Sequence, residues 1–169
     1  MRIERIFRAL KDADARYVVV GGLAVVAHGF ARLTGDIDLV IDSEPEAARH
    51  AIATLCSIGF SPRAPIDPLG FADAAQRKRW LEEKNLQVLA LRDPDQPLVE
   101  IDLLADTAVD FGDLFAAAKL HTIGETSIRI ASIEHLITTK KAAGRPQDWI
   151  DIEALEALRK KGPGRGSQT

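Results

Sequence analysis

Apolar positions along the chain follow two spacings in turn, one helical and one extended. Residues 2–13 carry an apolar stripe at helical spacing, formed by Ile3, Ile6, Phe7 and Leu10. Further helices are predicted at residues 23–31, 43–58, 71–83, 132–141 and 148–161. Short aliphatic runs predict strands at residues 18–20, 36–42, 86–91, 98–104, 120–123 and 127–130. Because strands and helices alternate, we expect an α/β fold with a mixed sheet, flanking helices and a C-terminal helical pair.

The stretch from residue 18 to residue 42 holds the most specific pattern. Three β-branched valines run into Gly21 and Gly22, a helix of small residues follows, and the next strand carries Asp36 and Asp38. Side chains alternate between faces of a strand that rises about 3.3 Å per residue, so the two aspartates point the same way, about 6 to 7 Å apart at Cα. Two carboxylates on one face of a strand can share divalent cations.

The glycine pair indicates which ligand would bind together with those divalent cations. Gly21 and Gly22 allow the backbone to turn sharply and to approach a ligand closely. The helix that follows offers unpaired N–H groups and the positive end of its dipole to a phosphate. A phosphate-binding turn beside paired carboxylates implies a metal-bound nucleoside triphosphate as the ligand.

These residues resemble a known signature. A glycine pair, a short helix and then Thr34-Gly-Asp-Ile-Asp-Leu look like the motif of the DNA polymerase beta-like nucleotidyltransferase superfamily. Arg32 and Thr34, ahead of the acidic pair, narrow the resemblance to the minimal bacterial nucleotidyltransferases that include the AbiEii-like toxins. The resemblance implies the nucleotidyltransferase fold and Mg²⁺-dependent transfer of a nucleotide.

The superfamily also uses a third carboxylate on a later strand, and the chain supplies a candidate. Residues 97–104 read as a strand with Glu100 and Asp102 on one face, and Asp102 matches the third acidic position. By this resemblance Asp36, Asp38 and Asp102 would be catalytic and would hold two Mg²⁺ ions, or Mn²⁺, about 3.5 to 4 Å apart, with Asp102 as the base. Without cations, clustered carboxylates repel, so at least one should have a raised pKa.

The resemblance implies nucleotide-binding and supporting groups as well. The nucleotide-binding set is Gly21, Gly22, Arg32, Thr34 and Lys140. The segment 140–151 is similar to the family's lysine, arginine and aspartate motif, in which Lys140 would neutralise triphosphate charge. Arg145, Asp148 and Asp151 would brace the helix junction or orient groups at the site. From the residues alone, Asp148 is equally explained as a first-turn helix residue and Asp151 as an ion-pair partner.

Composition limits the class of protein. With 169 residues and 46% hydrophobic content, we expect one domain over residues 1–161, followed by a flexible tail at 162–169. Neither a membrane helix nor a signal peptide is predicted, so the expected compartment is the cytoplasm. The single cysteine, Cys56, excludes an internal disulfide. The net charge of −3 argues against a chain that is basic throughout to bind nucleic acid.

Basic and aromatic side chains gather in the predicted helix 71–83, at Arg77, Lys78, Arg79 and Trp80. This patch is a candidate contact for nucleic acid, since tryptophan can stack on a base while arginine and lysine meet phosphate. The alternative is a surface helix with Trp80 packed against the core. Competing motifs are absent from the sequence: the dinucleotide-binding glycine pattern, the P-loop and His-Glu-x-x-His.

The acceptor of the transfer is left open by the sequence. One hypothesis is an AbiEii-like toxin that moves a nucleotide onto RNA or protein and is restrained by an antitoxin partner. A second is a small-molecule nucleotidyltransferase of the aminoglycoside-modifying type. A third is a module of the same fold that binds a nucleotide or a partner without catalysis. Templated polymerisation is not expected, because no long appended domain would hold a template.

Overall fold

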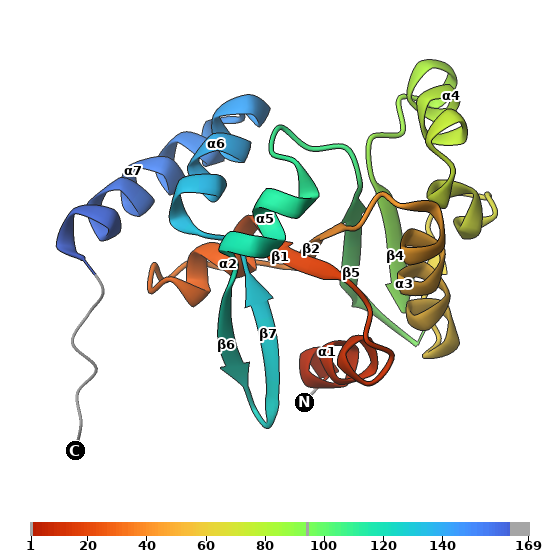
Figure 1. Ribbon diagram of the computed structural model, residues 1–169, viewed down its shortest axis with the longest axis horizontal. Coiled ribbons are helices and arrows are strands. Elements are labelled where there is room, and N and C mark those ends of the chain that lie inside the picture. Colours follow the sequence, from red (N-terminus) through yellow and green to blue (C-terminus); the bar gives the residue numbers. More distant parts are fainter. Residues whose placement is uncertain (1, 94, 163–169) are drawn as a thin grey trace.

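A mixed sheet forms the centre of the computed structural model, which describes residues 2–93 and 95–162 (Figure 1). Within that part of the chain the sheet has seven strands in the order β3-β4-β5-β2-β1-β7-β6. The strands are β1 (Tyr17–Val20), β2 (Asp36–Ile41), β3 (Ser61–Pro62), β4 (Leu89–Asp93), β5 (Gln96–Leu104), β6 (Lys119–Ile123) and β7 (Thr126–Ile130). β2 runs parallel to β5 and antiparallel to β1, which confirms the expected mixed sheet.

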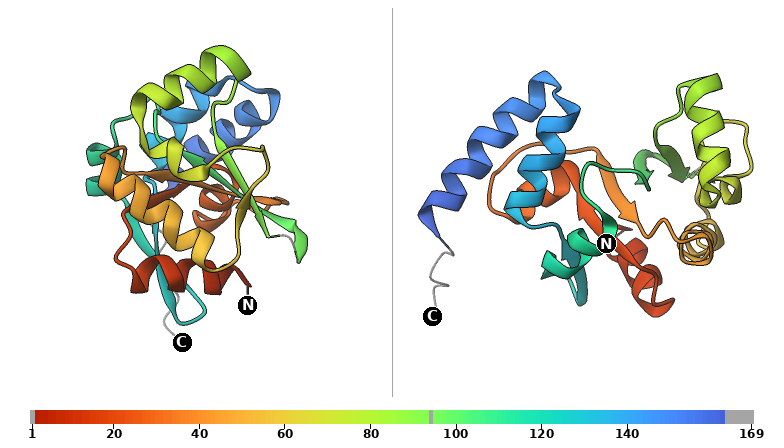
Figure 2. Two further views of the ribbon diagram at one scale, coloured as in Figure 1. Left: turned by 90° about the vertical axis from the view of Figure 1, so that its right-hand side faces the viewer. Right: turned by 45° about the horizontal axis from the view of Figure 1, so that its top comes forward.

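Helices flank this sheet, as the sequence predicted. They are α1 (Arg2–Asp12), α2 (Gly21–Ala27), α3 (Pro45–Ser57), α4 (Ala74–Lys84), α5 (Phe111–Ala117), α6 (Ile133–Ala143) and α7 (Pro146–Lys161), with a 3-10 helix η1 at Pro68–Ala72. α1 packs on α3 and β7, while α6 and α7 pair with each other. The α6–α7 pair and α4 lie at opposite ends of the molecule (Figures 1 and 2).

The core lies between the sheet and its helices. All four residues of β1 are buried, and so are three of the four residues of the predicted stripe of α1, since Ile6, Phe7 and Leu10 have no exposed surface and Ile3 is partly buried. Burying a side chain of this size stabilises the fold by about 1.5 to 3 kcal/mol. The central strands are thus held in place from both faces, and the polar residues that they carry take fixed positions.

The structure corrects several predicted boundaries. α2 begins at Gly21 itself, with a φ of 63°, and ends at Ala27 instead of continuing to residue 31. α3 begins at Pro45 instead of residue 43, and the side chain of Glu44 caps it. α5 is not predicted from the sequence, because its seven residues are too few for a clear helical stripe. α7 starts at Pro146, where proline at the first helical turn loses no hydrogen bond.

The last helix, α7, ends close to the C-terminus of the described part of the chain. α7 ends at Lys161, the last residue of the helix predicted at residues 148–161. Apart from Gly162, the predicted tail at 162–169 lies outside the described residues. None of the helices in the described part combines the length and the apolar character needed to cross a membrane.

Candidate active site

Two neighbouring strands bring the predicted carboxylates together. β2 and β5 pair in parallel, so that Asp36 stands opposite Glu100 and Asp38 stands opposite Asp102. Side chains of directly paired residues point to the same face of a sheet, about 5 Å apart at Cβ. All three predicted acidic residues therefore share one face, as the alternation along each strand required.

The glycine pair lies directly against this acidic face. Val20, the last residue of β1, pairs with Asp38, so the chain turns into α2 beside that carboxylate. A Cβ on Gly21 would overlap the carboxylate of Asp38, and one on Gly22 would lie 2.6 Å from Oγ1 of Thr34. The backbone N–H of Gly22 donates a hydrogen bond to Asp38. Only glycine permits this approach, and Gly21 also has the positive φ that glycine tolerates.

Burial and mutual repulsion raise the pKa of two of the carboxyls. For Asp38 the larger cause is burial and the second is the charge of Asp36, while Arg145 and Lys140 act in the opposite direction. Burial, followed by the charges of Asp38, Asp36 and Glu100, raises the pKa of Asp102 to about 6. The raised pKa expected for clustered carboxylates is thus present, and it is largest at Asp102.

The carboxylate oxygens of this face are suitable ligands for a magnesium ion that binds together with a nucleotide. Oδ1 of Asp102 is buried and has no hydrogen-bond partner, a costly state for a carboxylate that a cation would relieve. Among the described residues, no three His, Cys, Asp or Glu side chains form a ready-made metal cage. Magnesium does not need such a cage, since one or two carboxylates usually bind it together with substrate phosphates and water.

A buried ion cluster stands on the other side of the glycine pair. Lys140 of α6 is 5% exposed, and its Nζ donates to Asp148 at 3.2 Å and to Asp151 at 2.7 Å. Asp151 is fully buried and also accepts a hydrogen bond from Arg32 at 2.5 Å. Asp148 accepts from the backbone N–H of Arg145, so its expected first-turn role is confirmed, and from the Arg145 guanidinium.

This cluster joins three separate parts of the chain. Arg32 comes from the loop after α2, Lys140 from α6, and the two aspartates from α7. Burial acts to raise the pKa of Asp148, but hydrogen bonds from Arg145 and Lys140 hold that pKa below its ordinary value. Arg145 is the most exposed member, with 73% of its side chain accessible. It is therefore the cation of this cluster best placed to meet a ligand.

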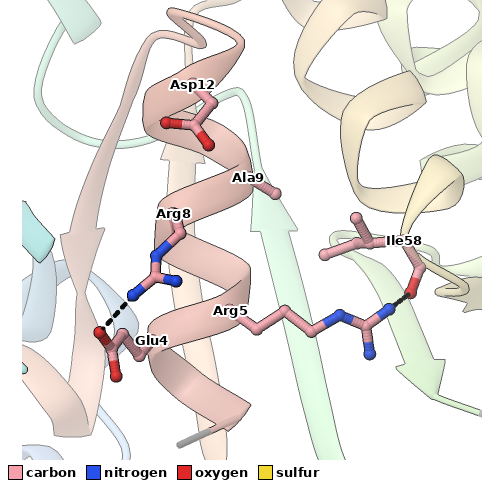
Figure 3. Close-up of a pocket in the computed structure, with 6 residues that line it drawn as sticks. All are labelled: Glu4, Arg5, Arg8, Ala9, Asp12 and Ile58. Carbon is pink, nitrogen blue, oxygen red and sulfur yellow. Dashed lines mark hydrogen bonds and ion pairs between the residues drawn. The ribbon is translucent and has the colours of Figure 1, made fainter.

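One hollow of about 260 Å³ is bordered by the glycine pair, by Asp36, Asp38 and Asp102, and by residues of the ion cluster. Every predicted site residue except Asp151, which is buried beneath the hollow, lines it. Leu33, Gly35 and Gln147 also line the hollow and were not predicted from the sequence. Larger hollows exist elsewhere. One of about 480 Å³ lies along the outer side of α1 (Figure 3), but it contains none of the predicted residues. The chemistry of the lining, rather than volume, identifies the site.

The basic and aromatic patch predicted for nucleic acid has a structural explanation. Trp80 is 7% exposed and belongs to the core, as the alternative interpretation held. Arg77 is 5% exposed, and its guanidinium donates to the backbone oxygen of Phe71 and to Asp106. Lys78 and Arg79 remain exposed. A base could not stack on Trp80 without opening this packing.

Solved structures share this arrangement of elements. The lincosamide antibiotic adenylyltransferase LnuA, solved with lincomycin bound, is 15% identical with a TM-score of 0.59, over 92% of this chain and 95% of that chain. ANT(2")-Ia, solved in complex with adenylyl-2"-tobramycin, is 17% identical with a TM-score of 0.57, over 94% and 93%. TM1012 of Thermotoga maritima, provisionally assigned as a nucleotidyltransferase, is 18% identical with a TM-score of 0.55, over 95% and 89%. A comparison with curated proteins finds no match.

The fold is accordingly that of the polymerase beta-like nucleotidyltransferases. The model of one family covers residues 5–164: the nucleotidyl transferase AbiEii toxins of type IV toxin–antitoxin systems. The chain belongs to this family, and the family and fold are those of nucleotidyl transfer enzymes.

The raised pKa of Asp102 leads to a prediction about stability. Between pH 3.8 and about 6, the folded state binds a proton that the unfolded chain has released, so the free energy of unfolding falls as the pH rises. The shift corresponds to at most about 3 kcal/mol, and solvent screening of this half-buried group reduces it to roughly 1 to 2 kcal/mol. Asp102→Asn should therefore stabilise the protein by that amount at pH 8, and hardly at all at pH 3.5.

Urea unfolding in the presence of a chelator measures this difference at both pH values. The control is Asp113→Asn, an exposed aspartate in the first turn of α5, for which the difference between pH 3.5 and pH 8 should be smaller than for Asp102→Asn. An equal gain from Asp102→Asn at the two pH values would show that the pKa of Asp102 is not raised.

Proposed function

We propose that this protein is a Mg²⁺-dependent nucleotidyltransferase that moves a nucleoside monophosphate from an NTP to an acceptor hydroxyl in the cytoplasm. The observation that carries the proposal is the pairing of Asp38 with Asp102, with Gly21 packed against the Asp38 carboxylate. The basic side chains of Arg32, Lys140 and Arg145 line the same hollow beyond the glycine pair. Phosphoryl transfer needs carboxylates that bind metal ions and, next to them, basic side chains that bind phosphate.

The carboxylates and the cations would have different tasks. Asp36, Asp38 and Asp102 would hold the Mg²⁺ ions, which would screen the triphosphate and acidify the acceptor hydroxyl. Gly21 and Gly22 would let the phosphates approach the backbone, and Thr34 lines the same hollow. Arg145 would bind the leaving phosphates. Arg32 and Lys140, although paired with Asp151, would make the electrostatic potential at the phosphates more positive.

The transfer step balances without a further reactant. The acceptor oxygen forms a bond to the α-phosphorus, the bond from that phosphorus to the bridging oxygen breaks, and pyrophosphate leaves with the electron pair. The proton of the acceptor hydroxyl goes to Asp102. Asp102 is placed for this task by its position opposite Asp38 on the acidic face of β2 and β5.

The acceptor we favour is RNA or protein, with an antitoxin protein as the partner that restrains the activity. Membership in a toxin family supports this. The likeness of fold to LnuA and ANT(2")-Ia supports a second candidate, a small-molecule acceptor. Growth arrest on expression, relieved by Asp36→Ala, would favour the toxin, whereas resistance to an antibiotic would favour the second candidate.

Calorimetric titration of the four Mg–NTPs into the protein tests the proposal. We expect one NTP to bind, with binding lost on removal of Mg²⁺ and in the double variant Asp36→Ala, Asp38→Ala. Circular dichroism of the double variant should match the wild type. If a well-folded wild-type protein binds none of the four, the enzyme assignment fails and a non-catalytic partner-binding module of the same fold becomes the better description.

A further inference from the structure

A second hollow lies on the other side of Asp102, away from the glycine pair. It has a volume of about 250 Å³ and is lined by Arg63, Ala64, Leu86, Val88, Leu89 and Ala90. Ala90 of β4 pairs with Asp102 of β5, so their side chains share one face, and adjacent strands are about 4.8 Å apart. None of the six lining residues borders the hollow that contains the glycine pair.

The order of strands places the two hollows on opposite sides of the catalytic carboxylates. Across the sheet, the sequence is β3, β4, β5, β2, β1, with Asp102 on β5 and Asp38 on β2. In an in-line displacement, the attacking oxygen enters opposite the leaving group. If pyrophosphate leaves toward the basic side chains of the ion cluster, which lie beyond β1, the acceptor must enter from the side of β4 and β3.

Arg63 supplies the charge on that side. It follows β3, its backbone N–H donates to the oxygen of Ala90, and its guanidinium donates to Glu100 at 3.3 Å. Glu100 shares the face of Asp102, and the charge of Arg63 is felt by the Asp102 carboxyl. The Arg63 side chain is 67% exposed, so its weak surface ion pair can be exchanged for a phosphate, which guanidinium binds through two parallel hydrogen bonds.

We propose that this hollow holds the acceptor, and that the acceptor end is a nucleotide whose base or sugar packs on Ala64, Val88 and Ala90 while its phosphate binds Arg63. The lining offers one cation and no carboxylate, which suits a phosphate-bearing group and not a polycationic sugar. This inference rests on the proposed function, since it assigns the acceptor side of the same site.

NMR titration of AMP into the ¹⁵N-labelled full chain tests the assignment. AMP is added alone, and again after the donor hollow is filled with Mg²⁺ and the α,β-methylene analogue of the NTP that calorimetry selects. In both titrations we expect shifts at the amides of Ala64 and Ala90. Arg63→Ala should weaken AMP binding at least about 10-fold, which is the loss of about one charge-assisted contact.

The matched control is Arg49→Ala, a half-exposed arginine on α3 that should bind AMP like the wild type. Arg63→Ala should still bind the Mg²⁺ analogue, which shows that the variant is folded. AMP binding that is unaffected by Arg63→Ala, or AMP shifts confined to Gly21 and Gly22, would overturn the proposal. Absence of Mg²⁺-analogue shifts at Gly21 and Gly22 in the wild type would instead overturn the proposed function.

A single-stranded RNA hexamer with a free 3′ hydroxyl separates the two sources of such a nucleotide. If the acceptor is the end of a polynucleotide, the hexamer should displace AMP and bind at least about 10-fold more tightly, because further phosphates add electrostatic contacts. If it is a free mononucleotide, AMP should bind as tightly as the hexamer. Failure of both probes to shift Ala64 and Ala90 would remove the hollow from the acceptor's path.

Discussion

Asp38→Ala should abolish nucleotidyl transfer and leave the fold intact. Asp38 lies opposite Asp102 and against Gly21, so it is the carboxylate that joins the two acidic strands to the phosphate turn. Loss of a metal-binding carboxylate should lower the rate at least about 10³-fold, equivalent to about 4 kcal/mol of transition-state stabilisation. Because burial and Asp36 raise the pKa of Asp38, removing its charge costs the folded state nothing.

The measurement is transfer of label from an α-³²P-labelled NTP to macromolecules in a cell extract. Asp113→Ala serves as the control, since that aspartate is exposed on α5 and does not line the hollow that Asp38 borders. Thermal unfolding in the absence of Mg²⁺ should show Asp38→Ala at least as stable as the wild type. Full transfer activity in this variant would remove Asp38 from the site.

Asp151→Ala should cause the largest loss of stability of any single substitution in the site. Asp151 has no exposed surface and accepts hydrogen bonds from Lys140 and Arg32, so its removal leaves two cations with one fewer partner at a buried position. Breaking a buried ion pair on one side costs about 3 to 5 kcal/mol. Urea unfolding followed by circular dichroism measures the change in the free energy of unfolding.

The neighbouring acid Glu153 provides the comparison for this experiment. It lies on the same helix and is exposed, so Glu153→Ala should change the free energy of unfolding by less than about 0.5 kcal/mol. The double variant Lys140→Met, Asp151→Leu should regain much of the loss, because a buried pair can often be replaced by apolar side chains. An Asp151→Ala protein as stable as the wild type would mean that solvent already reaches the cluster.

The positions of the carboxylates could be predicted from sequence because strand alternation is a local property. Asp36 and Asp38 fall on one face in any straight strand, whereas Asp102 was placed with them by resemblance to the superfamily's third acidic position, and the structure pairs it with Asp38. The glycine pair was recognisable for the same local reason. Motif resemblance extended this local information to the family, which the family comparison confirms.

The burial of Lys140 could not be read from the sequence. Its neighbours along α6 indicate only a helix, whereas its state depends on Asp148 and Asp151 across the helix junction and on the loop that carries Arg32. The role of Lys140 in neutralising a triphosphate remains a prediction. The structure adds that its charge is already shared between two carboxylates, while Arg145 is free to face the solvent.

Arg63 lay equally beyond sequence reasoning, and for a similar reason. It stands in a loop rich in proline, where no periodicity indicates the direction of a side chain. Only the pairing of β3 with β4 and of β4 with β5 brings it to Glu100, near Asp102. Long-range strand order therefore decides which loop residues surround the carboxylates.

The parallel pairing of β2 with β5 has a consequence for synthesis on the ribosome. β1 and β2 can pair as soon as both have emerged, but β5 and the cations of α6 and α7 come from much later in the chain. At roughly 5 to 20 residues per second, the interval between Asp38 and Asp151 is on the order of ten seconds. During that interval the nascent chain carries acidic residues without the later basic side chains that would bind a triphosphate. The complete candidate site can therefore form only after almost all of the helices have been translated.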